Sequence, residues 1–239
     1  MARCSHKRGV LRVNATTVPF VPQERLNATT VSTAVSTPTG RFDELCARAA
    51  GCRACPGMGC APVLSPANGP AGARVVFVGE APGRLGAGRT GVPFSGDVAG
   101  DRFELLLGEA GLRREAVFVT NAVLCLPLDA RGLNRTPHRR ESRSCSGWLR
   151  ETIDAVQPRV VVAVGRIALE ALAEIEPHGL TLARAGGDPV RWRGGHLAVV
   201  YHPGARAQVH RPWAAQVQDW CALGTWLMER ARLERKLRA

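Results

Sequence analysis

The sequence predicts a three-layer α/β/α sandwich around a central four-stranded parallel sheet. Four short apolar, β-branched runs recur along the chain, and each is continuous, as expected for a parallel strand buried on both faces. Segments with helical spacing separate these runs, which is the alternation typical of βαβ units. A ligand of such a sheet binds beyond the carboxyl ends of the strands. The four runs are Val75–Val78, Val117–Val119, Val160–Val164 and Leu197–Val200.

A helix is predicted after the first strand because apolar side chains recur there at helical spacing. Phe103, Leu106, Leu107 and Ala110 fall at i, i+3, i+4 and i+7, and Gly111 supplies a stop.

Three further helices are predicted along the chain. After the second strand, Thr136-Pro137 is a plausible N-cap with proline in the first turn, and the helix ends before Pro158. A third helix includes 167–172, and a closing helix covers about 213–227.

Composition at the two ends of the chain differs from that of the middle. Residues 1–40 are rich in threonine and lack helical or strand periodicity, which predicts a disordered leader. The folded domain is expected over residues 41–228. Residues 229–239 carry five arginines or lysines against two glutamates, so we expect a basic C-terminal tail, either a solvated helix end or a binding arm.

Charge and cysteine usage limit the class of protein. Lysine plus arginine is 32 against 20 acidic residues, giving a formal charge of +12, which favours a polyanionic partner such as nucleic acid. No apolar run is long enough to span a membrane and the start lacks a secretory signal, so we expect a cytoplasmic, monomeric protein, nucleoid-associated when on DNA. Eight cysteines in that setting predict metal ligation before disulfides.

Polar side chains close three of the four strands. Glu80 follows the first strand after Gly79, within a glycine-dense stretch where backbone N–H groups can approach a ligand. Asn121 ends the second strand, and His202 follows the fourth. Because the carboxyl ends of parallel strands share one edge, these residues predict a site there. The fingerprints of dinucleotide and P-loop nucleotide binding are both absent.

Four cysteines have the spacing of a metal centre. Cys52 and Cys55 form a CxxC pair, and Cys125 and Cys145 supply two more thiolates. Spacing alone leaves zinc open as a tetrahedral thiolate site. Cys60 lies five residues after Cys55 and could replace one of the four ligands.

The motif order resembles the uracil-DNA glycosylase superfamily over about residues 46–225. The order is GEAPG, TGVPFSGD, TNAVLC, NRTPHRRE with Cys145, and YHPG. The NRxP stretch followed by ExxxC is similar to the iron–sulfur branch, family 4, whereas RTGxPFxGD resembles family 5. This resemblance implies the α/β/α fold of the superfamily and a [4Fe–4S] cluster on Cys52, Cys55, Cys125 and Cys145, each a thiolate ligand.

The resemblance also implies roles for the strand-end residues. Asp97 occupies the position of the family 5 catalytic acid, and its alternative is a helix N-cap. Glu80 is the acidic residue of the family 4 motif and the second candidate for the catalytic carboxylate. His202 would donate a hydrogen bond to the uracil O2 as charge builds there. The implied uracil-binding residues are Gly79, Glu80, Phe94, Asn121 and His202.

The implied activity is release of free uracil from DNA after base flipping, leaving an abasic site. Arg206, His210 and Arg211 follow the His–Pro motif and are expected to contact DNA, as is Arg135. The intercalating residue of the family is not matched here. The only lysines, Lys7 and Lys236, lie in the tails, which disfavours Schiff-base strand cleavage. Two alternatives remain: a damaged-DNA binding module without turnover, and a glycosylase with broader specificity for deaminated bases such as hypoxanthine.

Overall fold

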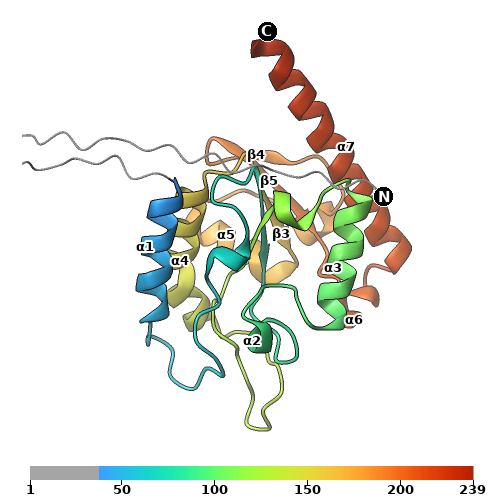
Figure 1. The fold of residues 1–239 in the computed structure, drawn as a ribbon. Coiled ribbons are helices and arrows are strands. Elements are labelled where there is room, and N and C mark those ends of the chain that lie inside the picture. Colours follow the sequence, from blue (N-terminus) through green and yellow to red (C-terminus); the bar gives the residue numbers. More distant parts are fainter. Residues whose placement is uncertain (1–37, 239) are drawn as a thin grey trace, which may run out of the picture. The chain divides into compact units, whose positions relative to one another are not determined.

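The computed structural model describes residues 38–238 and shows three layers built on one sheet (Figure 1). This arrangement confirms the predicted α/β/α class. The strands follow the order β2-β1-β3-β5-β4 across the sheet, and every neighbouring pair is parallel except β4 with β5. Their bounds are β1 (Val75–Gly79), β2 (Phe118–Asn121), β3 (Val160–Val164), β4 (Val190–Trp192) and β5 (Gly195–Val200).

The sheet has five strands, so the predicted count of four is wrong by one edge strand. β4 is three residues long and pairs antiparallel with β5, from which only Arg193 and Gly194 separate it. Both turn residues have positive φ, 45° and 73°, as a tight hairpin turn of matching twist requires. Three residues are too few to show a strand pattern in the sequence, and β4 exists because the hairpin holds it against β5.

Helices cover both faces of the sheet, and the side chains of each strand alternate between the two cores. Val76 and Val78 of β1 face the helices α1, α4 and α5, whereas Val75 and Phe77 face α3 and α7. Phe77 stacks on Trp220 of α7 with ring centroids 5.2 Å apart. The helix bounds are α1 (Pro38–Ala50), α3 (Val98–Glu109), α4 (Arg139–Val156), α5 (Arg166–Ile175) and α7 (Trp213–Arg238).

Element boundaries differ from the sequence-based expectations at both ends of the domain. α1 begins at Pro38, three residues before the predicted domain start; the rest of the expected leader, residues 1–37, lies outside the described residues. α7 continues through the expected 228/229 boundary to Arg238, so the basic tail is the end of this helix. Glu234, inside that tail, forms an ion pair with Arg74 at 2.5 Å, which ties it to the domain.

The start of α4 also lies later than predicted, at Arg139 instead of near Thr136-Pro137. Its N-cap is His138, whose backbone N–H donates to Glu141 at 2.7 Å in a capping box. Glu141 also accepts two hydrogen bonds from Arg135, each 2.7 Å long. The buried Glu141 therefore fixes both the helix start and the preceding loop.

None of the helices in the described part of the chain is long and apolar enough to cross a membrane.

The contact between α3 and α7 depends on a glycine. A Cβ at Gly224 of α7 would lie 2.3 Å from the carbonyl oxygen of Ala110, so the helices approach more closely than a side chain allows. We therefore expect Gly224→Ala to lower the free energy of unfolding by about 1–3 kcal/mol through overpacking. Chemical denaturation measures this change.

Gly147 of α4 provides the matched control, because a Cβ there meets nothing within 4 Å. Gly147→Ala should raise the free energy of unfolding by about 0.5–1 kcal/mol, since alanine loses less backbone entropy in a helix. Equal effects of the two substitutions would show that the α3–α7 contact does not require glycine.

Candidate functional site

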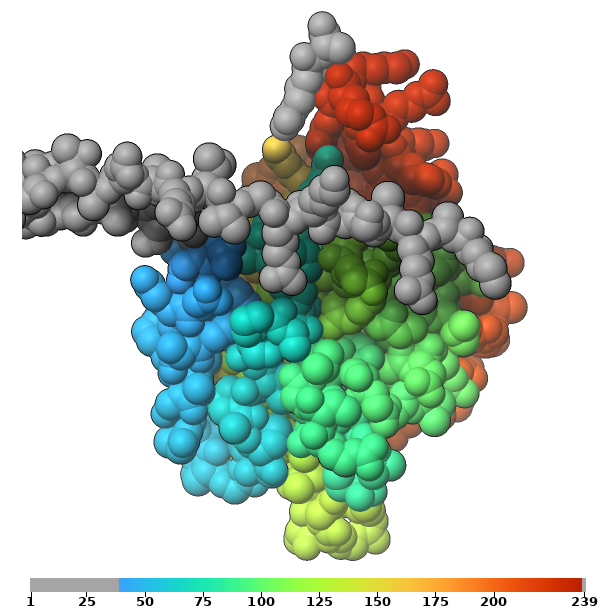
Figure 2. Space-filling view, viewed as in Figure 1, coloured from blue at the N-terminus to red at the C-terminus, as the bar shows by residue number. Residues whose placement is uncertain are grey.

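A cavity of about 650 Å³ lies at the carboxyl ends of β1, β2 and β5. Figure 2 shows the same end of the molecule in space-filling form, with the loop that precedes α4 projecting from it. Glu80, Asn121 and His202 all line this cavity, as the strand-end rule predicted. The sheet therefore brings together three residues that are far apart in the sequence.

Gly79 allows two of the predicted uracil-binding side chains to meet over the end of β1. A Cβ at this position would lie 2.5 Å from Oδ1 of Asn121 and 2.8 Å from Cε2 of Phe94. Both distances are shorter than real Cβ contacts, so any other residue would push these side chains apart. Gly79 thus contributes to the site by its missing side chain.

Phe94 provides an aromatic surface inside the cavity. Its ring stacks on Phe103, with centroids 4.4 Å apart, and lies 5.5 Å from the ring of His202. Its backbone is held at φ 51°, a conformation that costs energy for a bulky residue and is found in the described chain at only two other non-glycine positions. The strained backbone aims the ring at the cavity.

Asp97 performs the N-cap role and also faces the cavity. Its Oδ1 accepts a hydrogen bond from the Gly100 N–H at 2.9 Å, which caps α3. Its Oδ2 lies against Gly86, where an added Cβ would approach within 2.4 Å. Asp97 can therefore be both a helix N-cap and a candidate catalytic carboxylate, because its two carboxylate oxygens have different surroundings.

His202 is positioned as a neutral hydrogen-bond donor. Its Nδ1 is 2.9 Å from the Gly204 nitrogen and accepts that N–H, which places the ring proton on Nε2. Burial lowers the pKa of His202 to about 4, and the carboxylate of Asp97 acts in the opposite direction. The ring is therefore uncharged near neutral pH.

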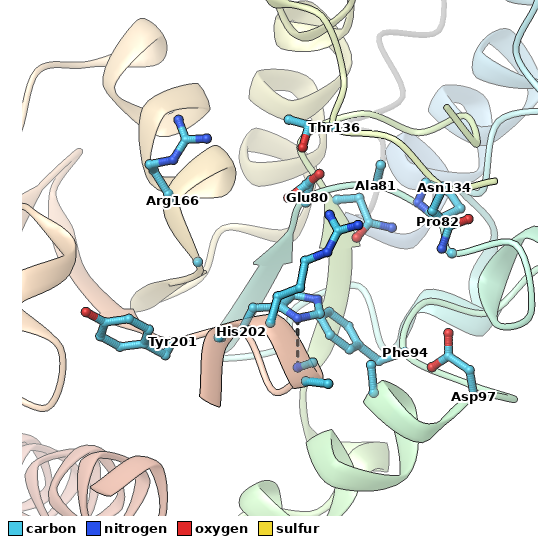
Figure 3. A pocket seen from close by; sticks show the side chains of 18 of the residues that line it. Glu80, Ala81, Pro82, Phe94, Asp97, Asn134, Thr136, Arg166, Tyr201 and His202 are labelled. Atoms are coloured by element: carbon cyan, nitrogen blue, oxygen red, sulfur yellow. Dashed lines mark hydrogen bonds between the residues drawn. The ribbon is translucent and has the colours of Figure 1, made fainter. Parts of the chain in front are cut away.

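Glu80 is the second carboxylate of the cavity. Burial raises its pKa, Arg166 and Arg206 lower it, and Glu170 raises it. Figure 3 shows Glu80 and Asp97 at separate positions in the cavity, with Asp97 beside Phe94. The cavity therefore holds two carboxylates at distinct positions.

The four residues predicted to contact DNA fall into two groups. Arg206 and His210 line the cavity. Arg135 also lines it, but its guanidinium is engaged by Glu141, and Arg211 is engaged by the buried Asp219. These ion pairs favour a loop-fixing role for Arg135 and Arg211 over the predicted DNA contact.

Sequence reasoning missed several residues that line the cavity, among them Asn134, Arg166 and Tyr201. The Asn134 Oδ1 accepts the Arg84 N–H at 2.9 Å, which joins the loop before α4 to the loop after β1. Arg166 lies two residues beyond the end of β3, so the same strand-end rule could have found it. Tyr201 precedes His202 and is the only tyrosine in the sequence.

The predicted metal ligands gather beside Leu124–Leu126, the segment just after β2. Gly59 and Val63 donate backbone hydrogen bonds to the carbonyls of Leu126 and Leu124, both at 2.8 Å, and bind the cysteine loop to this segment. The thiol of Cys145, on α4, interacts with the Leu124 backbone.

Four other cysteines lie near enough to Cys125 to influence its pKa. Burial raises the pKa of Cys125 to about 12, with further increases from Cys145, Cys60, Cys52 and Cys55. Among residues 38–238, no three metal-ligating side chains stand in a coordinating arrangement. Thiolates are the ligands that iron–sulfur clusters and structural zinc sites take, so the side-chain type in this region fits either group.

Comparison with known proteins shows to which family this chain is related. The family model described as "Uracil DNA glycosylase superfamily" matches residues 66–223. A type-4 uracil-DNA glycosylase of Thermotoga maritima is 39% identical over 131 residues, which cover 54% of this chain and 64% of that protein. The chain thus spans just under two thirds of this relative.

A relative of the other type matches over a longer stretch. A type-5 uracil-DNA glycosylase of Pyrobaculum aerophilum is 32% identical over 198 residues, or 71% of this chain and 85% of that protein. The fold, the order of the strand-end motifs and these matches lead to one conclusion: the chain belongs to the uracil-DNA glycosylase superfamily.

Proposed function

We propose that this protein is a monofunctional uracil-DNA glycosylase, which hydrolyses the N-glycosidic bond of uracil in DNA and leaves an abasic site. The observation that carries the proposal is the convergence of Asn121, Phe94, Asp97 and His202 in one cavity. The curated relatives described above carry this activity in their names.

Bond cleavage of this kind needs stabilisation of two charges. Positive charge develops on the sugar, in an oxocarbenium-like state, and negative charge develops on the departing uracil. The Nε2–H of the neutral His202 donates to the uracil O2, where the negative charge collects. The free Oδ2 of Asp97 stabilises the sugar cation and orients the attacking water.

Base recognition falls to Asn121 and Phe94. The Asn121 side-chain amide both donates and accepts, so it can pair with uracil O4 and N3–H. Phe94 stacks on the base after extrusion from the duplex, a step that costs a few kcal/mol and is easiest for mispaired uracil. Glu80 remains the second candidate for the carboxylate role, because it lines the same cavity.

The absence of a lysine in the cavity supports a monofunctional reaction. Within residues 38–238 the single lysine is Lys236, near the end of α7 and outside the cavity lining. Strand cleavage through a Schiff base needs an amine beside the sugar. Water is therefore the nucleophile.

A single-turnover assay on labelled duplexes tests the activity. Duplexes that contain G·U, A·U, G·T or hypoxanthine are incubated with the protein and then treated with alkali. Breakage at uracil only after alkali is the expected result. A tight complex without breakage would replace the proposed enzyme with a binding module, and breakage at hypoxanthine would broaden its specificity.

Asp97→Asn and His202→Ala should each lower the single-turnover rate by at least about 10²-fold, because each removes stabilisation of a charge formed in the transition state. DNA binding, measured by fluorescence anisotropy, should change little. Wild-type rates in both variants would exclude the assigned roles. Asp97→Asn keeps a cap oxygen, and a thermal unfolding scan separates loss of the N-cap from loss of catalysis.

The pH dependence of excision tests the neutral state of His202. Because burial depresses the folded-state pKa to about 4, the ring stays neutral as pH falls through the ordinary histidine value of 6.5. The single-turnover rate should therefore show no loss near pH 6.5 that depends on His202. A descending limb centred there, absent in His202→Gln, would mean that the ring is protonated in solution.

We further infer that Cys52, Cys55, Cys125 and Cys145 hold a [4Fe–4S] cluster. The electrostatic influence of the other three thiols on Cys125 supports this inference. The resemblance of the NRxP stretch and the following ExxxC to the iron–sulfur branch of the superfamily supports it as well. A bound cluster would supply a cross-link between the loop after α1, the segment after β2, and α4. We assign it no redox step.

Removal of a ligand should release iron. Cys125→Ala is expected to abolish the absorbance near 400 nm and to lower the melting temperature, since structural metal binding is coupled to folding. Cys221→Ala, at an exposed thiol on α7, is the matched control and should retain full iron content. Undiminished iron in Cys125→Ala, measured by a colorimetric iron assay, would show that the ligand set is wrong.

A further inference from the structure

A second cavity, also of about 650 Å³, lies at the opposite end of the strands from the cavity described above. It is formed where the end of α4, the residues just before β3, the turn between β4 and β5, and one residue of α1 meet. No residue lines both cavities. We call it the amino-end cavity, and its charged and amide side chains are Arg41, Asp154, Gln157, Arg159 and Arg193.

Positive charge is in excess in the lining of the amino-end cavity. Arg41, Arg159 and Arg193 come from three separate segments, and Asp154 is the one acidic residue among the lining residues. The C-terminal end of α4 also attracts cations. However, a helix dipole equivalent to about half an elementary charge, together with one carboxylate, does not balance three guanidinium groups. The walls of this cavity would therefore attract an anion.

Two of the lining residues have backbone conformations that favour glycine or asparagine. Gln157 caps the end of α4 at φ 54°, and Arg193 begins the β4–β5 turn at φ 45°. Among residues 38–238, Phe94 in the first cavity is the only other non-glycine residue with positive φ. Conformations of this kind cost energy, and they cluster at functional sites. Both strained positions outside the first cavity thus line the second.

The guanidinium of Arg193 lacks part of its hydrogen bonding. Its Nη2 donates to Oδ1 of Asp154 at 2.9 Å, whereas its Nη1 is buried and has no hydrogen-bond partner within the described part of the chain. A buried donor without an acceptor is costly, and a bound anion is one way to satisfy it. The side chain of Asp154 is 54% exposed, so water can solvate its carboxylate when Arg193 turns toward a ligand.

The backbone that carries Arg159 and Arg193 is held in place without a ligand. The His196 N–H donates to the Arg159 carbonyl at 3.0 Å, and a Cβ at Gly195 would lie 2.6 Å from the same oxygen. The β4–β5 turn therefore packs directly against the residues before β3. The Arg193 N–H also donates to Oε1 of Glu176 at 3.1 Å. Binding an anion here would require reorientation of side chains only, which keeps the cost of binding low.

We propose that the amino-end cavity binds a phosphate group, with Arg159 and Arg193 as its main contacts and the amide of Gln157 as a further donor. A phosphate monoester carries a charge of about −1.5 to −2 at pH 7 and three strong acceptor oxygens, which match the excess charge of the lining and the planar N–H groups of arginine. A carboxylate has less charge. The cavity has the size of a small-molecule site, so both free phosphate and a phosphate monoester are sources of this group.

Arg193→Asn separates binding from structure, because Asn-Gly is the preferred pair in a turn of this type. Without phosphate, the melting temperature of this variant should equal or exceed that of the wild type. Its dissociation constant for inorganic phosphate, measured by isothermal titration calorimetry, should rise at least about tenfold, since a charge-assisted contact is lost. A lower melting temperature with unchanged phosphate affinity would make Arg193 a structural residue and overturn the inference.

Two further variants locate the bound phosphate. Arg159→Gln should weaken phosphate binding as Arg193→Asn does. Arg166→Gln is the matched control, because it removes one exposed arginine from the first cavity, and it should leave phosphate affinity unchanged. Loss of binding in Arg166→Gln but not in Arg159→Gln would place the anion in the first cavity and refute the proposed site.

Titrations with inorganic phosphate and with thymidine 5′-monophosphate distinguish the two sources of the group. Equal affinities that both depend on Arg193 would identify free phosphate as sufficient, whereas tighter binding of the nucleotide would identify a monoester whose organic part fills the rest of the cavity. Sodium chloride at matched ionic strength controls for general screening of charge. If neither phosphate compound gives saturable binding beyond that of chloride, the amino-end cavity is not a phosphate site.

Discussion

The site depends on the parallel pairing of β1 with β2. Their register sets Gly79 directly opposite Asn121, at the last position of both strands. At that point the backbone of β1 has no Cβ, so the amide of Asn121 and the ring of Phe94 can close over it. The pairing of β3 with β5 then brings His202, two residues beyond β5, to the same edge. A shift of register by one residue would turn Asn121 to the other face of the sheet.

Asp97 and His202 are held in the cavity in the same way, each by a hydrogen bond from a backbone N–H to one of its side-chain atoms. Asp97 uses Oδ1 to cap α3, and His202 uses Nδ1 to accept a backbone N–H from its own loop. Each side chain is thus fixed by one atom, while Oδ2 and Nε2 remain available to a substrate. Groups that are already oriented need little reorganisation when charge develops, which is the main source of electrostatic catalysis in the proposed reaction.

The segments that surround the cavity are held by buried ion pairs and by the cysteine region. Glu141 binds Arg135 through both carboxylate oxygens and also caps α4. Asp219 binds Arg211 in the same two-point manner beside α7. These pairs fix the loops that follow β2 and β5, and the proposed cluster would add a covalent cross-link to the first of them.

The sequence by itself determined the fold class, the four parallel strands and several of the residues that line the cavity. Continuous apolar runs mark buried strands, and the polar residue after each one falls at a shared edge, which is how Glu80, Asn121 and His202 could be predicted. The order of the motifs, through their resemblance to the superfamily, added Phe94 and Asp97 to the predicted site residues. These signals are local in the sequence, so they can be recognised without knowledge of the packing.

Only the tertiary structure decided which arginines are engaged by buried carboxylates, and at which residues the helices and strands begin and end. Arg135, Arg166, Arg206 and Arg211 look alike in the sequence, but Arg135 and Arg211 are paired with buried carboxylates, whereas Arg166 and Arg206 line the cavity without such a partner. The partners Glu141 and Asp219 become visible only when the chain folds, as does β4, which exists by pairing with β5. Contacts between residues distant in sequence, or dependent on a neighbouring element, leave no periodic pattern.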